Sequence, residues 1–208
     1  SIKSNQMKYM NKEDISTQTF AITINSDDRN KILYKSPYDF KMIFENEHNN
    51  INKIQGTIYK NMTNIIKIEV ISVIIPSHYQ IENLPYLILE IDELGGNGSG
   101  SNEWLDKGFG KLFFAQKLGK FHIHTNKLNS IEKNFNTSID FNSLTIRIRK
   151  PNGDIWSCQD KQEQEQERNK QEQEQNKQEQ EQNKQEQEQN KELPFTLELK
   201  FTQKKKKK

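Results

Sequence analysis

The chain has 208 residues, a formal net charge of +2 and a hydrophobic content of only 31%. This length suits one domain of ordinary size, and the near-neutral charge argues against a broad basic face that wraps duplex nucleic acid. The only cysteine, Cys158, excludes an intrachain disulfide, and no apolar run approaches the roughly 20 residues that span a bilayer. We also expect no signal peptide, so these features together favour folding in a reducing compartment.

The first segment, residues 1–17, is polar and shows no sustained periodicity. It predicts a flexible N-terminal arm that orders only against a partner. From residue 18 onward, short stretches of apolar and β-branched residues are typical of β-strands. The clearest candidates are 19–25, 38–45, 86–92, 144–149 and 195–201, and weaker ones occur at 57–59, 111–116, 121–124 and 139–140. Four of the clear ones alternate, and the side chains expected to face the core are Phe20, Ile22, Ile24, Tyr38, Phe40, Met42, Phe44, Leu144, Ile146, Ile148, Phe195, Leu197, Leu199 and Phe201.

The longest apolar run, 64–76, consists mostly of Ile and Val, which fit a strand better than a helix. In its first half, one face carries the apolar residues Ile66, Ile68 and Val70. After Ser72 the apolar residues have the opposite parity, and such a one-residue shift predicts a β-bulge. Pro76 has no N–H to donate and is expected to end the strand.

A tight turn is predicted at Pro151-Asn-Gly153, directly after the strand at 144–149. The return strand is then interrupted, because 159–192 contains no apolar residue and carries 11 acidic and 6 basic side chains. Three perfect copies of KQEQEQN fill 170–190, and no position of this repeat is apolar, so a coiled coil would have no seam to bury. We predict a low-complexity insertion over 159–191, disordered or marginally helical, with a partner-binding coiled coil as the alternative.

The chain ends in a basic tail, residues 203–208, whose charged members are Lys204, Lys205, Lys206, Lys207 and Lys208. The usual state of such a run is a solvated tail. The alternative is a weak contact with nucleic acid or with an anionic membrane, worth about 1 kcal/mol per Lys near anionic lipid.

Short strands separated by turn signals, with no convincing amphipathic helix, predict an all-β fold. The bulged long strand and the long cross-connections favour a single antiparallel jelly-roll sandwich over a simple meander. We expect this domain to comprise 18–158 and 192–202, with the insertion in a late loop between strands. An insertion there is tolerable because the cost of closing a loop grows only logarithmically with its length.

No catalytic, cofactor or metal site is predicted. The Gly-rich loop 95–102 lacks the Gly-Lys-Ser/Thr ending of a P-loop, and no Gly-x-Ser-x-Gly elbow occurs. His122 and His124 share one strand face, as cupin metal ligands would, but no third ligand stands at a supporting spacing. We therefore expect surface or interface histidines, no enzyme activity and no small-molecule substrate.

Five segments occur in a familiar order: ITINSDDRN, YKSPYDFKMIF, IIKIEVISVIIPSHY, LPYLILEIDEL, and LNSIEKNF followed by LTIRIRKPNGDIW. In this order they resemble the single-jelly-roll minor capsid or penton (vertex) proteins of large double-stranded DNA viruses, the giant-virus lineage. The resemblance covers roughly 18–157 and 193–202. It implies a structural protein of the virion capsid, assembled in the host cytoplasm as a homopentamer with contacts to other capsid proteins.

Large aromatic residues gather between the Gly-rich loop and the short strands around it, namely Tyr86, Trp104, Phe109, Phe113 and Phe121. In a vertex protein we expect Tyr86, Trp104, Phe109 and Phe113 to be subunit contacts, with Trp104 and Phe109 exposed. The alternative function is a lectin-like jelly roll for host attachment, with Trp104, Asn102 and Asp106 as the carbohydrate platform. A cupin-type enzyme is a third hypothesis, which the missing metal ligands disfavour.

Overall fold

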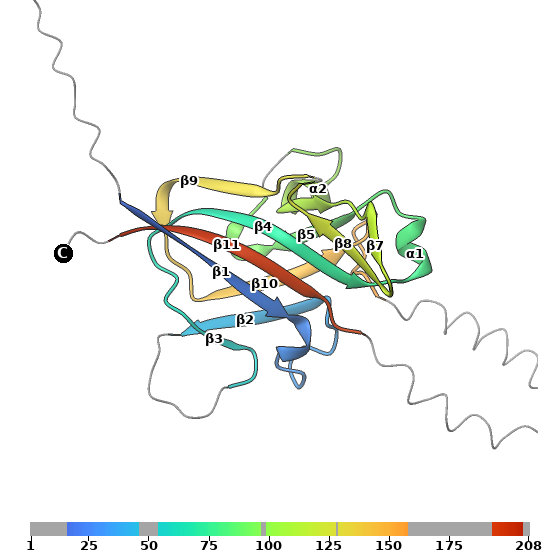
Figure 1. The fold of residues 1–208 in the computed structure, drawn as a ribbon, viewed down its shortest axis with the longest axis horizontal. Coiled ribbons are helices and arrows are strands. Elements are labelled where there is room, and N and C mark those ends of the chain that lie inside the picture. The colour runs from blue at the N-terminus through green and yellow to red at the C-terminus, as the bar shows by residue number, and fades with distance from the viewer. Residues whose placement is uncertain (1–15, 46–53, 97–98, 128, 158–192, 206–208) are drawn as a thin grey trace, which may run out of the picture.

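The computed structural model describes residues 16–45, 54–96, 99–127, 129–157 and 193–205, and these residues form an all-β fold of two sheets (Figure 1). The strands are β1 (Thr17–Asn25), β2 (Asp39–Glu45), β3 (Thr57–Tyr59), β4 (Ile65–Pro76), β5 (Leu87–Ile91), β6 (Gly110–Leu112), β7 (Gln116–Leu118), β8 (Phe121–Thr125), β9 (Glu132–Ile139), β10 (Ser143–Arg149) and β11 (Thr196–Lys204). The helical elements are short: η1 (Ser26–Asp28), α1 (Tyr79–Glu82), η2 (Asp92–Leu94) and α2 (Glu103–Lys107).

The two sheets differ in composition but share the core between them. Sheet A has the order β1-β11-β4-β8-β7, with β9 also beside β4, and sheet B has the order β3-β2-β10-β5-β6. The pairs are antiparallel except for β2 and β3, which run parallel. The expected all-antiparallel arrangement is therefore wrong at this one edge, where β3 reaches β2 through a long connection.

Strand β4 contains the predicted bulge and a second one. Its register against β11 passes from Ser72 opposite Glu198 to Val70 opposite Leu199, so Ile71 is the extra residue. This bulge moves the buried parity from Val70 to Val73, as the sequence predicted. A second shift leaves Ile66 without a direct partner on β11. As a result Ile65 is fully buried and Ile66 only partly so, which corrects the expected inward position of Ile66.

The core consists of the inward residues of both sheets. Alternation in the sequence placed most of them correctly, because a half-buried strand shows its inner face at every second residue. Those confirmed as buried include Ile22, Ile24, Tyr38, Phe40, Met42, Phe44, Leu144, Ile146, Ile148, Phe195, Leu197, Leu199 and Phe201. Phe20 is only partly buried and stacks on Phe201, with 5.5 Å between the ring centroids.

Every residue of β5 is buried, although a strand in a two-sheet sandwich usually exposes one face. Leu87, Leu89 and Ile91 belong to the core, whereas Ile88 is covered from outside by the segment that contains α2. A Cβ atom added at Gly108 would lie 2.8 Å from Ile88 Cγ2, so this segment packs closely on the strand. The outer face of β5 is therefore a second, smaller buried region.

The expected turn at Pro151-Asn-Gly153 is present. Gly153 N–H donates to the Lys150 carbonyl at 3.0 Å, and Lys150 N–H donates to the Asp154 carbonyl at 2.8 Å. The expected fragment at 139–140 is longer in the structure, where β9 covers 132–139. The sequence around β9 lacks clear alternation, because only its Glu132–Asn134 end and Ile139 pair directly with β4.

The expected basic tail begins later than predicted, since Gln203 and Lys204 belong to β11 and pair with Gln18 and Thr17. The expected insertion at 159–191 and all but the last two residues of the expected arm at 1–17 lie outside the described residues. Among the described helices, none has the length and apolar character needed to cross a membrane.

Candidate functional site

Exposed apolar side chains gather at one end of the sandwich. The register places Asn25 beside Thr196, Thr196 beside Ile74, and Pro76 beside Phe121, so these strand ends lie together. Of the eight large apolar side chains that are exposed among the described residues, six come from loops and strand ends at this end: Ile32, Leu33, Phe113, Leu118, Phe121 and Leu193. We call this region the apolar end.

The most apolar part of this end is built by the segment from β6 to β8. The β7–β8 hairpin pairs Leu118 with Phe121, and these side chains are 70% and 46% exposed. Phe113, which is 38% exposed, contacts Tyr86 edge-on, with 6.1 Å between the ring centroids. Beside them lies a hollow of about 300 Å³. Its lining is mostly apolar, with Ile81, Leu84, Pro85, Tyr86, Phe113 and Phe114, and it also includes Glu82 and His122. Side chains of this type can receive an apolar side chain from another protein.

The two histidines pack on the inner side of the apolar end. His122 is 4% exposed and His124 is fully buried, so the expectation of surface or interface histidines is wrong for the single chain. His124 Nδ1 accepts a hydrogen bond from Phe113 N–H at 3.1 Å, and His122 Nε2 lies 3.1 Å from Ser77 Oγ. The ring of Phe114 packs edge-on against both imidazoles. They thus anchor the chain that carries Phe113.

Burial lowers the pKa of His124 below its ordinary value, and burial together with the nearby Lys117 lowers the pKa of His122. Both rings are therefore neutral at pH 7. Within the described residues, no group of three or more His, Cys, Asp or Glu side chains is arranged to hold a metal ion. What the structure shows for the pair is packing against Phe114.

The predicted contact residues separate into three environments. Phe109 is fully buried in the core, so the expectation that its ring is exposed is wrong. Its N–H donates to the Leu89 carbonyl at 2.7 Å, which draws the residue inward beside β5. Tyr86 and Phe113 lie together at the apolar end. The sequence could not distinguish Phe109 from Phe113, because both flank very short strands without alternation.

Trp104 is only partly buried, but two side chains of the same chain pack on its ring. The guanidinium of Arg149 and the ammonium of Lys107 lie 4.8 Å and 4.9 Å from the ring centroid. The backbone of Gly153 passes so close that an added Cβ atom would meet Trp104 Nε1 at 2.1 Å. Trp104 therefore joins α2 to the turn at 151–153, and the expectation of a freely exposed ring is wrong.

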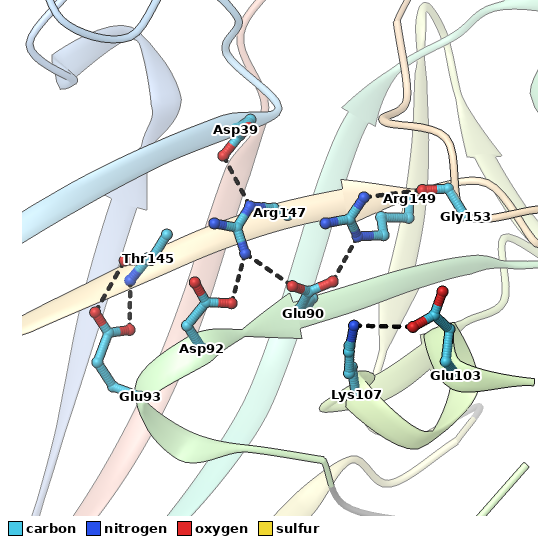
Figure 2. Close-up of polar contacts among 10 residues, drawn as sticks. All are labelled: Asp39, Glu90, Asp92, Glu93, Glu103, Lys107, Thr145, Arg147, Arg149 and Gly153. Atoms are coloured by element: carbon cyan, nitrogen blue, oxygen red, sulfur yellow. Dashed lines mark hydrogen bonds and ion pairs between the residues drawn. The ribbon is translucent and has the colours of Figure 1, made fainter.

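A network of charged side chains covers the outer face of sheet B (Figure 2), and its member Arg149 lies over the Trp104 ring. Arg147 contacts the carboxylates of Asp39, Glu90 and Asp92, and Arg149 contacts Glu90 and the Gly153 carbonyl. Burial alone would raise the pKa of Glu90, but hydrogen bonds from Arg149 and Arg147 lower it. Glu93 extends the network by accepting hydrogen bonds from Thr145 N–H and Oγ1 at 2.6 and 2.9 Å.

Arg147 and Arg149 on β10 contact carboxylates on β2 and β5, so the network links these three strands on the outer face of sheet B. The sequence showed only alternating Thr145, Arg147 and Arg149 on one strand. Their carboxylate partners come from β2, β5 and η2, and only the order of the strands brings these elements together.

Two of the predicted anionic-partner contacts, Lys204 and Lys205, lie at the opposite end from the apolar end. Lys204 is part of β11, and Lys205 N–H donates to the Ser16 carbonyl at 2.9 Å. Lys206, Lys207 and Lys208 lie outside the described residues.

The sequence did not lead us to predict Leu118, Ile32 and Leu33 as exposed apolar residues, although their position beside turn residues was a usable signal.

Comparisons of this chain with known protein-family models and with curated proteins found no match.

Proposed function

We propose that this chain is a non-enzymatic structural subunit of a virus capsid, a vertex (penton) or minor capsid component that assembles through its apolar end. The observation that carries the proposal is the gathering of exposed Phe113, Leu118 and Phe121 at one end of a rigid two-sheet domain. Exposed apolar patches of this kind mark interaction surfaces, because burying them against a partner is favourable. The apolar end would contact further copies of the chain and other capsid proteins in the virion.

Strand pairing supports a jelly-roll topology for this subunit. The antiparallel pairs β1–β11, β2–β10, β4–β8 and β5–β6 join the first principal strand to the last, the second to the next to last, and so on inward. A chain paired in this way is one long hairpin that has been folded into two sheets. The pairs β1–β11 and β4–β8 lie in sheet A, and the other two lie in sheet B.

A rigid sandwich that presents an apolar end suits closed rings. Rotational symmetry turns one contact between two different surfaces into a closed assembly in which every subunit has the same environment. The hollow beside Tyr86 and Phe113 can receive an exposed side chain such as Leu118 from the neighbouring copy. We propose five copies in the ring, the number that the capsid-vertex resemblance implies.

The carbohydrate-binding alternative is less well supported. Its platform required a free Trp104 ring with Asn102 and Asp106 beside it. Asn102 Oδ1 accepts from Leu105 N–H at 3.0 Å, and Asp106 Oδ1 accepts from Gly100 N–H at 2.7 Å. These side chains stabilise their own loop, and the ring of Trp104 is occupied by Arg149 and Lys107.

Analytical ultracentrifugation of the full chain tests the proposal. We expect a closed oligomer, and we expect the double substitution Leu118→Ser with Phe121→Ser to weaken it by about 2 kcal/mol or more per contact. The matched control is Ile43→Ser, which removes an apolar side chain of 44% exposure from the outer face of sheet B. It should leave assembly unchanged. A chain that is monomeric, or one whose assembly tolerates the double substitution, would rule out this surface, and circular dichroism verifies that each variant is folded.

A further inference from the structure

Within the part of the chain that the structure describes, strand β1 is an edge of sheet A. It pairs with β11 on one side over all nine residues without a register shift. Among the described residues, no strand pairs with its other side. Ser26 N–H donates to the Phe195 carbonyl, and Lys205 N–H donates to the Ser16 carbonyl. Because hydrogen-bonded positions alternate in an antiparallel pair, the even-numbered residues of β1 bond to β11. The N–H and C=O groups of the odd-numbered residues therefore point to the free side.

This edge lacks the features that usually prevent pairing between sheets. Natural edge strands are protected by charged side chains, by proline, by bulges or by shortness. Strand β1 has nine residues, TQTFAITIN, with no charge and no proline. The exposed residues of β1 are Thr17, Gln18, Thr19, Ala21 and Thr23. The cations next to β1 belong to its neighbours: Lys204 and Lys200 on β11 lie opposite Thr17 and Ala21, and the Lys60 ammonium lies 4.5 Å from the Phe20 ring centroid.

We propose that β1 pairs with β1 of a second copy of this chain, antiparallel and about a two-fold axis at Ala21, which joins two A sheets into one continuous sheet. Ala21 is the middle residue of the strand. Two-fold pairing about it sets Thr19 opposite Thr23 of the second copy and Thr17 opposite Asn25. All of these are odd-numbered residues, so each N–H and C=O on the free side meets a partner.

The occupant is a second copy because the edge is complementary to itself. A two-fold contact brings each residue of β1 against another residue of β1, and the absence of charge means that no like charges meet. Threonine pairs across antiparallel strands are favourable, and the small side chain of Ala21 leaves room at the axis. This contact is separate from the apolar end and does not depend on the proposed function, since it uses the free side of β1.

A charge-swap series measured by sedimentation equilibrium tests the pairing. The background is the full chain with Leu118→Ser and Phe121→Ser, so that association through the apolar end does not contribute. In this background we expect a dimer. Thr19→Lys with Thr23→Lys places lysine opposite lysine at both symmetric positions and should weaken dimerisation by about tenfold or more. Thr19→Glu with Thr23→Lys places glutamate opposite lysine and should restore it.

Thr137→Lys is the matched control, because Thr137 is an exposed residue of β9. It adds a charge to a strand elsewhere and should leave the dimer unchanged. A background protein that stays monomeric at high concentration would overturn the proposal. So would a dimer that tolerates two lysines at Thr19 and Thr23, or one that the glutamate–lysine combination fails to restore. Circular dichroism of each variant separates loss of pairing from loss of folding.

Discussion

Glu90 on β5 and Arg147 on β10 face each other across sheet B, with 2.8 Å between Glu90 Oε1 and Arg147 Nη1. The Glu90 side chain is only 6% exposed, whereas the two other carboxylates on Arg147, Asp39 and Asp92, are 43% and 42% exposed. Glu90 also contacts Arg149. This carboxylate therefore lies between two arginines. Their hydrogen bonds take the place of those that water would donate to it.

The first prediction concerns this pairing. Glu90→Gln keeps the shape of the side chain but leaves Arg149 without its carboxylate, so we expect the free energy of unfolding to fall by about 2 kcal/mol. The exposed partner Asp39 serves as the control, and Asp39→Asn should cost less than about 1 kcal/mol. Urea denaturation measures both. Equal effects of the two substitutions would mean that burial does not decide the strength of this network.

The second prediction is a pH dependence due to His122 and His124. Their pKa values in the folded chain are lowered from the ordinary value of 6.5, chiefly by burial. Between the folded and unfolded pKa values the unfolded chain therefore binds more protons, and stability is lost as the pH falls below about 6.5. Lys117 adds to this effect and Glu82 opposes it at His122.

Urea denaturation between about pH 7.5 and pH 5.5 measures this dependence. The variant with His122→Gln and His124→Asn carries polar side chains that take up no proton in this range, so its stability should change less with pH. Its stability at pH 7.5 supplies the reference for any packing cost of the substitutions. An unchanged slope in the variant would show that other groups cause the acid sensitivity.

The third prediction compares two glycines that both have positive φ angles. Gly153 has φ +96 and would place a Cβ atom 2.1 Å from Trp104 Nε1, whereas a Cβ atom at Gly119, with φ +57, would meet nothing within 4 Å. Both alanine substitutions carry the backbone cost of about 1 kcal/mol. Gly153→Ala should cost at least about 1 kcal/mol more, because the indole must move.

A double-mutant cycle isolates this contact. Trp104→Ala removes the ring, so Gly153→Ala should cost less in that background than in the natural chain. Thermal unfolding of the four proteins gives the coupling. Strictly additive effects would mean that Trp104 does not pack on the turn at 151–153.

The fourth prediction concerns the repeat. Deleting 161–191 and joining the ends with a short Gly/Ser linker should change the free energy of unfolding by less than about 1 kcal/mol. The physical reason is that the deleted segment has no apolar residue to bury, while the residues on either side that enter the core, Trp156 and Phe195, are retained. Chemical denaturation of the deletion variant measures the change. A larger loss would show that the repeat packs on the domain.

Alternation in the sequence determined which side chains face the core along the regular strands. Phe40 and Met42 on β2, and Leu197 and Leu199 on β11, are buried as predicted, because a strand with one wet face must alternate. The shift of parity near Ser72 likewise predicted a bulge in β4, and the structure places its extra residue at Ile71. These are local signals, which depend only on neighbouring residues in the chain.

Only the tertiary structure determined which strands pair and which residues of the irregular segments are buried. Strand β11 inserts between β1 and β4, and this placement makes the uncharged strand β1 an edge of sheet A as far as the described residues extend. Phe109 entered the core while Phe113 stayed partly exposed, since backbone pairing with Leu89 draws only the former inward. Contacts between residues far apart in the chain depend on how whole sheets pack, and the periodicity of a single segment does not predict this packing.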